Sequence, residues 1–314
     1  MEKGNILKQE GAAQMKKIER IMVVIDANED YSNAPDGLPI ELRKALRFIK
    51  DKQAAEIKLL SVGYEKYLSH SFRDLTSDHH TLRKEYCDRL AEGMQGMVDQ
   101  LSQQGYTISS EVRWAHPRYE AIVKEALEFK ADLLIQHCRA YGKIEHHHLT
   151  NDSWQLVRHC PLPLLLVKDG EWSDPVVMMA AVDPMHSHSK PLNLDSLIID
   201  AASSVSEQIG CDFHVVHAYA EAARPFAPAG IIKAEHSAAF DELMSDYNFD
   251  KDKLHLIDET PVYALQQYSK KLNSNIIVMG AVSRSRFAEA LIGSTAEEVL
   301  DYVRTDILLV KPSA

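Results

Sequence analysis

The sequence predicts an α/β protein made of two tandem, doubly wound, five-stranded parallel sheets. Short and nearly continuous apolar runs recur along the chain, as is typical of strands covered on both faces. Amphipathic helical patterns separate these runs, and this alternation favours parallel sheets with helices on both sides. The series of elements occurs twice within the 314 residues, so the two halves are two versions of one domain.

The duplication sets the domain boundaries. Apolar runs that end in Asp26 and Asp183 open the two halves, and the Leu-Leu-Val-Lys ending at Lys168 returns at Lys311. We therefore expect a first domain at 1–170, with a polar tail at 1–19, and a second domain at 171–314. The turn-rich segment 169–175 joins them.

Each expected strand is rich in leucine or β-branched residues. In chain order the strands are expected at 20–26, 56–62, 107–114, 132–136, 163–167, 176–183, 213–219, 253–257, 275–279 and 306–310. The clearest helix is expected at 80–103, where apolar residues recur every three or four positions and Gly105 follows as a C-terminal cap. Further helical patterns begin at Pro117 and Pro261.

Composition excludes several classes of function. With 35 basic and 46 acidic side chains the net charge is −11, which argues against binding to nucleic acid or to anionic membranes. The apolar runs are far shorter than the roughly 18 residues of a membrane-spanning helix. Residues 1–19 lack the apolar core of a signal peptide, and the four cysteines form no CxxC pair. We therefore expect a cytoplasmic protein.

The most informative segment follows the fourth strand of the second half. Ligands of such sheets bind beyond the carboxyl ends of the strands. Gly280 ends this strand, and Gly293 and Ser294 precede an amphipathic helix. Glycine lets a phosphate approach the backbone, N–H groups at a helix start attract anions, and Arg284 could reach a polyphosphate. The alternative interpretation is structural, with Ser294 acting only as a helix cap.

The spacing G-x2-G-x9-G-[ST] after a fourth strand resembles the ATP-binding signature of the universal stress protein family. Gly280, Ser283, Gly293 and Ser294 fill it here. The resemblance covers both halves, so the chain is similar to tandem-type members. It implies a strand order of 3-2-1-4-5 in each half. It also implies that the last strands pair with each other, Leu164–Val167 against Ile307–Val310, as an internal pseudo-dimer that could associate further into a homodimer.

The resemblance further implies that the second half binds ATP or another adenine nucleotide, with Mg²⁺ as a candidate companion ion. The residues it assigns to binding are Asp183, His217, Ala218, Gly280, Ser283, Arg284, Gly293, Ser294 and Thr295. For His217, a strand-end histidine with internal partners is the alternative. Two residues depart from the family pattern, because Ser283 and Arg286 stand where glycines are usual, and a side chain at 283 would hinder phosphate approach.

The first half lacks this loop. Counted back from the last strands, the equivalents of Gly280, Ser283 and Gly293 are His137, Ala140 and Thr150. We expect no nucleotide binding there in the manner of the family.

The first half carries a histidine run instead, at His146, His147 and His148. Adjacent histidines point in different directions, so a run rarely supplies the convergent ligands that zinc requires. A solvated loop is the favoured interpretation. A zinc site made of these histidines and a carboxylate such as Glu145 is the alternative.

The leading hypothesis is therefore a cytoplasmic universal stress response protein without enzymatic activity or catalytic residues, whose second half binds a nucleotide. Two alternatives stay open. One is a carrier whose clefts hold a lipid-like or nucleotide-sugar ligand, and the other is a slow ATPase that binds zinc. A γ-phosphate transfer needs an arranged base or positioned water, which the sequence does not display.

Overall fold

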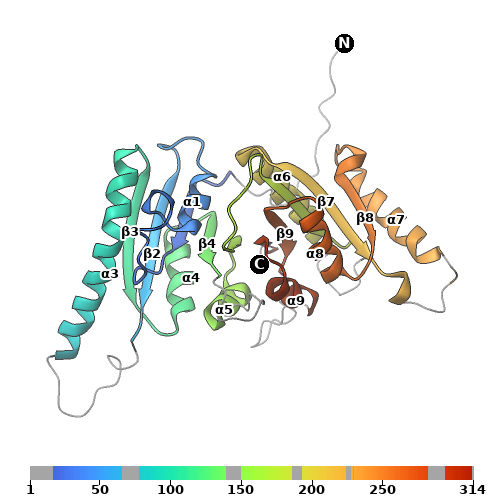
Figure 1. The fold of residues 1–314 in the computed structure, drawn as a ribbon. Helices are drawn as coiled ribbons and strands as arrows, with labels where there is room; N and C mark the ends of the chain where they lie inside the picture. Colours follow the sequence, from blue (N-terminus) through green and yellow to red (C-terminus); the bar gives the residue numbers. More distant parts are fainter. Residues whose placement is uncertain are drawn as a thin grey trace.

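The computed structural model describes residues 17–65, 78–138, 150–185, 193–223, 228, 230–281 and 294–312. For residues 78, 79, 223 and 294–296 it describes the backbone alone. The chain forms the expected α/β fold, with a single ten-stranded sheet running through both halves (Figure 1). All ten expected strands are present, and each begins within one residue of its predicted position.

The first half builds one end of this sheet. Its strands are β1 (Arg20–Val24), β2 (Glu56–Gly63), β3 (Thr107–Trp114), β4 (Leu133–His137) and β5 (Leu164–Val167). Its helices are α1 (Ile40–Leu46), α3 (Asp78–Gln103), α4 (Arg118–Glu128) and α5 (Asn151–His159), with a 3-10 turn at Pro35–Gly37. Gly105 has a φ of 87° after α3, which confirms the predicted cap.

The second half repeats the series with a longer first helix. Its strands are β6 (Val177–Val182), β7 (Asp212–Tyr219), β8 (Leu254–Asp258), β9 (Ile276–Gly280) and β10 (Asp306–Val310). Its helices are α6 (Leu194–Ile209), α7 (Ile231–Met244), α8 (Pro261–Lys271) and α9 (Ser294–Tyr302), with 3-10 turns at Glu221–Ala223 and Lys251–Lys253.

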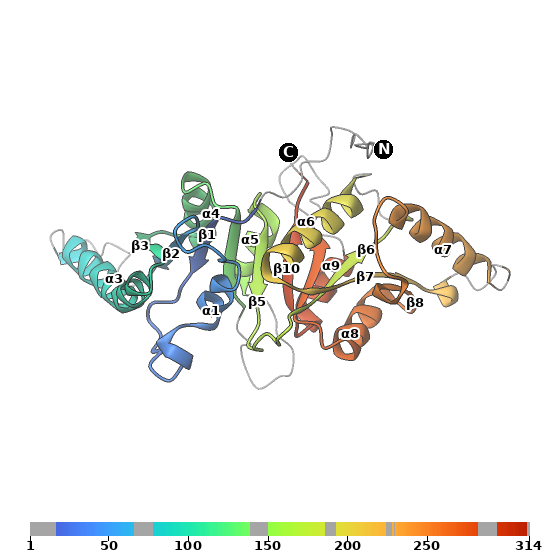
Figure 2. The ribbon, with the colours of Figure 1, turned by 90° about the horizontal axis from the view of Figure 1, so that it is seen from above.

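The strand order is β3-β2-β1-β4-β5-β10-β9-β6-β7-β8. This confirms the order 3-2-1-4-5 in each half and the expected pairing of the two last strands. Strands β5 and β10 run antiparallel with Leu165 opposite Leu308, and the other neighbours are parallel. The two halves therefore meet at the centre of one sheet, as Figure 2 shows from above.

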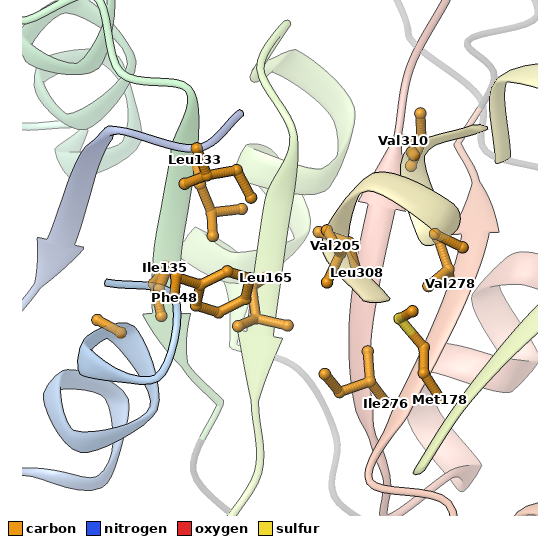
Figure 3. Close-up of a cluster of buried hydrophobic side chains, with 14 of the residues drawn as sticks. Phe48, Leu133, Ile135, Leu165, Met178, Val205, Ile276, Val278, Leu308 and Val310 are labelled. Carbon is orange, nitrogen blue, oxygen red and sulfur yellow. The ribbon is translucent and has the colours of Figure 1, made fainter. Parts of the chain in front are cut away.

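Helices cover both faces of the sheet. Residues of α1, α3, α6 and α7 contribute to the buried cluster on one face, and residues of α4, α5, α8 and α9 to the cluster on the other. Each cluster includes residues of both halves. Figure 3 shows the first cluster at the junction, where Phe48 and Leu165 lie on one side and Val205 and Leu308 on the other. The hydrophobic core is thus continuous across the duplication.

A buried carboxylate also joins the halves. Asp306, at the start of β10, accepts hydrogen bonds from Lys44 Nζ, from the backbone N–H of Lys168 and from Trp172 Nε1, each at 2.7 Å. The Lys44 and Asp306 side chains are 2% and 3% exposed. Burial raises the pKa of Asp306 and lowers the pKa of Lys44, and their mutual attraction opposes both shifts. All three partners are donors, and both oxygens of the carboxylate accept a hydrogen bond.

Gln208 of α6 makes a second polar link. Its side-chain oxygen accepts from the backbone N–H of Ile18 at 3.0 Å. Its Nε2 donates to the carbonyl oxygens of Ile18 and Phe48, each at 2.7 Å. One buried amide therefore satisfies three backbone groups of the first half. Within the described ranges, none of the helices combines the length and apolar character needed to cross a membrane.

Candidate functional site

The candidate site of the second half lies where the winding of its sheet reverses. Strand β6 pairs with β7 on one side and with β9 on the other, because the chain adds β7 and β8 before it returns to form β9. The carboxyl ends of β6 and β9 are therefore neighbours at a switch point, the usual ligand position in such sheets. Asp183 directly follows β6, and Gly280 is the last residue of β9.

Helix α6 fixes the chain after β6. The backbone N–H of Asp183 donates to Asp195 Oδ1 at 2.9 Å, and Asp195 is the second residue of α6 and buried. The Asp183 side chain remains half-buried at the edge of the sheet. A carboxylate held in this way can accept hydrogen bonds from a ligand above β6.

Gly280 is required by packing. A Cβ atom built on it would lie 2.7 Å and 2.9 Å from the two methyl carbons of Leu194 in α6. Among the described glycines, those with positive φ are Gly37, Gly105, Gly210 and Gly230, so Gly280 does not need a left-handed backbone. The close approach of α6 accounts for this glycine without any ligand.

The His217 side chain is only 1% exposed, and both its ring nitrogens have partners within the protein. Nδ1 lies 3.1 Å from the carbonyl oxygen of Val182 and therefore carries the proton. Nε2 lies 2.8 Å from Nδ1 of His236, and the two rings stack. Burial lowers the pKa of His217, which favours the neutral ring. His217 thus supports the end of β7 from within, while its neighbour Ala218 is half-buried against the other face.

The phosphate loop predicted from the sequence lies outside the described residues. This holds for Ser283, Arg284, Arg286 and Gly293, and also for the histidine run His146, His147 and His148 with Glu145 and for Ala140. Helix α9 already begins at Ser294, whereas Ser294 and Thr295 were expected to precede it, and the side chains of these two residues are not described. Their roles in binding remain predictions.

The equivalent region of the first half contains a pocket of about 240 Å³. His137, the counterpart of Gly280, ends β4 and lines it. The other lining residues come from the segment before α1, from α1 itself and from the chain after β5: Glu29, Tyr31, Ala34, Pro35, Pro39, Ile40, Glu41, Arg43, Asp169 and Glu171. Thr150, the counterpart of Gly293, caps α5 by accepting from the backbone N–H of Ser153 at 3.2 Å.

Glu41 is the most unusual group of this pocket. It is 1% exposed, and its Oε2 accepts no hydrogen bond among the described residues. Burial raises its pKa to about 7. His137 Nδ1 is 3.9 Å away, too far for a hydrogen bond, and His137 Nε2 contacts Asp169 Oδ1 at 2.8 Å. Burial also lowers the pKa of His137, so the ring tends to stay neutral.

From the sequence, His137 is visible as the replacement for a glycine and as one of several first-half histidines, whereas Glu41 and the pocket are not predicted. A signal was present, because Glu41 stands among apolar residues at the start of a helix, between Ile40 and Leu42. A carboxylate in that setting is buried when the helix packs on the sheet. Among the described residues, no group of three or more His, Cys, Asp or Glu side chains is arranged to hold a metal ion.

Comparison with known proteins adds family information. The model of the "Universal stress protein family" matches residues 17–168 and 197–311. Universal stress protein E of Photorhabdus laumondii is 27% identical, and the alignment covers 95% of this chain and 96% of that protein. Universal stress protein E of Escherichia coli K12 is 25% identical, with 95% of each chain covered.

Two solved structures share the fold across both halves. A protein of unknown function from Pseudomonas aeruginosa PAO1 aligns with a TM-score of 0.71 and 24% identity, covering 96% of this chain and 95% of that one. A universal stress protein from Archaeoglobus fulgidus aligns with a TM-score of 0.60 and 15% identity, covering 94% and 99%. The tandem arrangement is therefore found in other solved proteins.

Proposed function

The chain belongs to the universal stress protein family, and from that premise we propose that it is a cytoplasmic, non-enzymatic stress-response protein whose second half binds ATP or a related adenine nucleotide. The observation that carries the proposal is the meeting of β6 and β9 at a switch point, directly before a glycine- and arginine-containing loop. Helix α9 begins at Ser294, at the end of this loop, and the N-terminus of a helix is a favourable position for a phosphate.

In this proposal Asp183 accepts hydrogen bonds from the adenine or ribose side of the ligand. Gly293, Ser294 and Thr295 provide backbone and hydroxyl donors for the phosphates, and Arg284 neutralises their charge. Mg²⁺ would accompany the phosphates. His217 acts indirectly, because its two ring nitrogens already have partners and it holds the end of β7 in place.

Calorimetric titration of the full chain with ATP tests this function. Gly293→Asp places a negative charge and a side chain where the phosphate is expected, so we expect it to abolish binding. Thr150→Asp is the matched control, because it adds the same charge at the equivalent position of the first half and Asp is also a good helix cap. Equal binding by all three proteins, or no binding by the unmodified chain, would contradict the proposal.

Two further measurements separate the alternatives. Mass spectrometry of ligands extracted from the purified protein should release an adenine nucleotide, whereas a lipid-like or nucleotide-sugar molecule would support a carrier. Phosphate release from ATP should be negligible. Release that disappears in Gly293→Asp would instead support a slow ATPase.

A further inference from the structure

The pocket of the first half has a chemical character unlike a phosphate site. Among its described lining residues, four are carboxylates, namely Glu29, Glu41, Asp169 and Glu171, and one is an arginine. That arginine, Arg43, is already engaged, because its guanidinium contacts the carboxylate of Glu171 and the carbonyl oxygen of Leu38. A phosphate would meet excess negative charge here, whereas a cation would be attracted.

The buried oxygen of Glu41 indicates which kind of group is missing. A buried polar atom without a partner costs free energy, so such atoms in native proteins usually serve a purpose. Glu41 lines the pocket, and its buried Oε2 has no hydrogen-bond donor among the described residues. An N–H donor that enters the pocket would satisfy it, and a charged donor would do so most strongly.

The second half has a carboxylate at the position that corresponds to Glu41, and there the carboxylate has a partner within the protein. Glu41 is the second residue of α1, and Asp195 is the second residue of α6, the corresponding first helix. Asp195 accepts the backbone N–H of Asp183 and so has an internal partner. The carboxylate therefore has an internal partner in one half, whereas in the other half one of its oxygens is buried without a hydrogen-bond donor among the described residues, in a residue that lines a pocket.

The apolar lining residues and the volume of the pocket limit the kind and size of ligand that fits. The lining also includes four apolar residues, Ala34, Pro35, Pro39 and Ile40. The volume of about 240 Å³ corresponds to roughly eight water molecules of liquid volume, enough for a small organic molecule. A bare metal ion fits poorly, because the described side chains do not converge on one point as metal ligands must.

We propose that the pocket at the carboxyl ends of β1 and β4 binds a small organic cation, a protonated amine with a compact apolar body. Its ammonium group donates to Glu41 Oε2, and its carbon atoms lie against Pro35, Pro39 and Ile40. Asp169 holds His137 in place at the end of β4 through the 2.8 Å contact, and the ring forms part of the wall. The tandem chain then has two different binding sites, one in each half.

The test uses two probes of the same shape, cyclohexylammonium and cyclohexanol, titrated into the full chain and followed by ligand-observed NMR. We expect saturable binding of cyclohexylammonium and binding of cyclohexanol that is at least about tenfold weaker, because the alcohol lacks the charge. Glu41→Gln keeps the shape of the side chain and removes its charge, so cyclohexylammonium should also bind this variant at least about tenfold more weakly.

Glu128→Gln is the matched control, since the same change is made on an exposed carboxylate of α4 outside the pocket, and its affinity should equal that of the unmodified chain. Circular dichroism of each variant checks that it is folded. The proposal is overturned if neither probe binds saturably, if both bind equally, or if folded Glu41→Gln binds cyclohexylammonium as well as the unmodified chain. Binding should also persist in Gly293→Asp, so failure of the nucleotide proposal and failure of this one are distinguishable.

Discussion

The buried contact between Lys44 and Asp306 provides the sharpest test of how the halves are held together. We expect Asp306→Ala to lower the free energy of unfolding by about 3–5 kcal/mol, the usual loss when one partner of a buried ion pair is removed. The loss arises because the Lys44 side chain, 2% exposed, must then either stay charged without a counter-charge or give up its proton. The backbone N–H of Lys168 and Nε1 of Trp172 also lose their acceptor.

Urea unfolding followed by circular dichroism measures this change, provided that the dependence on urea concentration keeps the same slope. Glu128→Ala is the control, because it removes an ion pair whose side chains are 72% and 58% exposed, and it should cost no more than about 0.5 kcal/mol. The double variant Lys44→Met, Asp306→Leu should recover part of the lost stability. A loss below about 1 kcal/mol for Asp306→Ala would refute the reasoning, because the pair would then behave like an exposed one.

Three further perturbations test other parts of the molecule. Gln208→Ala should cost about 2–4 kcal/mol in the same assay, since it leaves three buried backbone groups without partners, and a cost below 1 kcal/mol would show that water replaces the amide. Gly280→Ala should cost about 1–3 kcal/mol because its methyl group meets Leu194, and Leu194→Ala introduced with it should remove most of that extra cost. Burial lowers the pKa of His255 from 6.5 to about 4, so the unfolded chain takes up the proton first and stability should fall as the pH drops from 6.5 toward 4. His255→Asn should flatten that part of the pH curve, and an unchanged curve would contradict the assignment.

Much of the fold was accessible from the sequence because its signals are local and repeated. The ten strands are short apolar runs that needed no tertiary information, and the duplication made each half a check on the other. Pairing of β5 with β10 followed from the family resemblance. Strand ends differed by up to two residues, as at Val24, because hydrogen bonding decides where a ladder stops.

The sites were less accessible, because side-chain burial and partners depend on packing between distant segments. Gly280 was predicted to serve a ligand, yet its first requirement is the approach of Leu194, 86 positions earlier in the chain. Glu41 lies about 100 residues from His137 in sequence and gave no motif. Such a site becomes visible only when the helix and the strand are placed together.

The antiparallel pairing of β5 with β10 also has a consequence for how the sequence of the protein can evolve. In a dimer of identical subunits, every contact across a two-fold seam occurs twice, so each substitution is felt on both sides. Here the seam joins two segments of one chain, and each side is encoded separately. Asp306 reaches across to Lys44, whereas the matching position in the first half is Pro163, which has no carboxylate to offer. Fusion has freed each half to acquire contacts and pockets that its twin does not share.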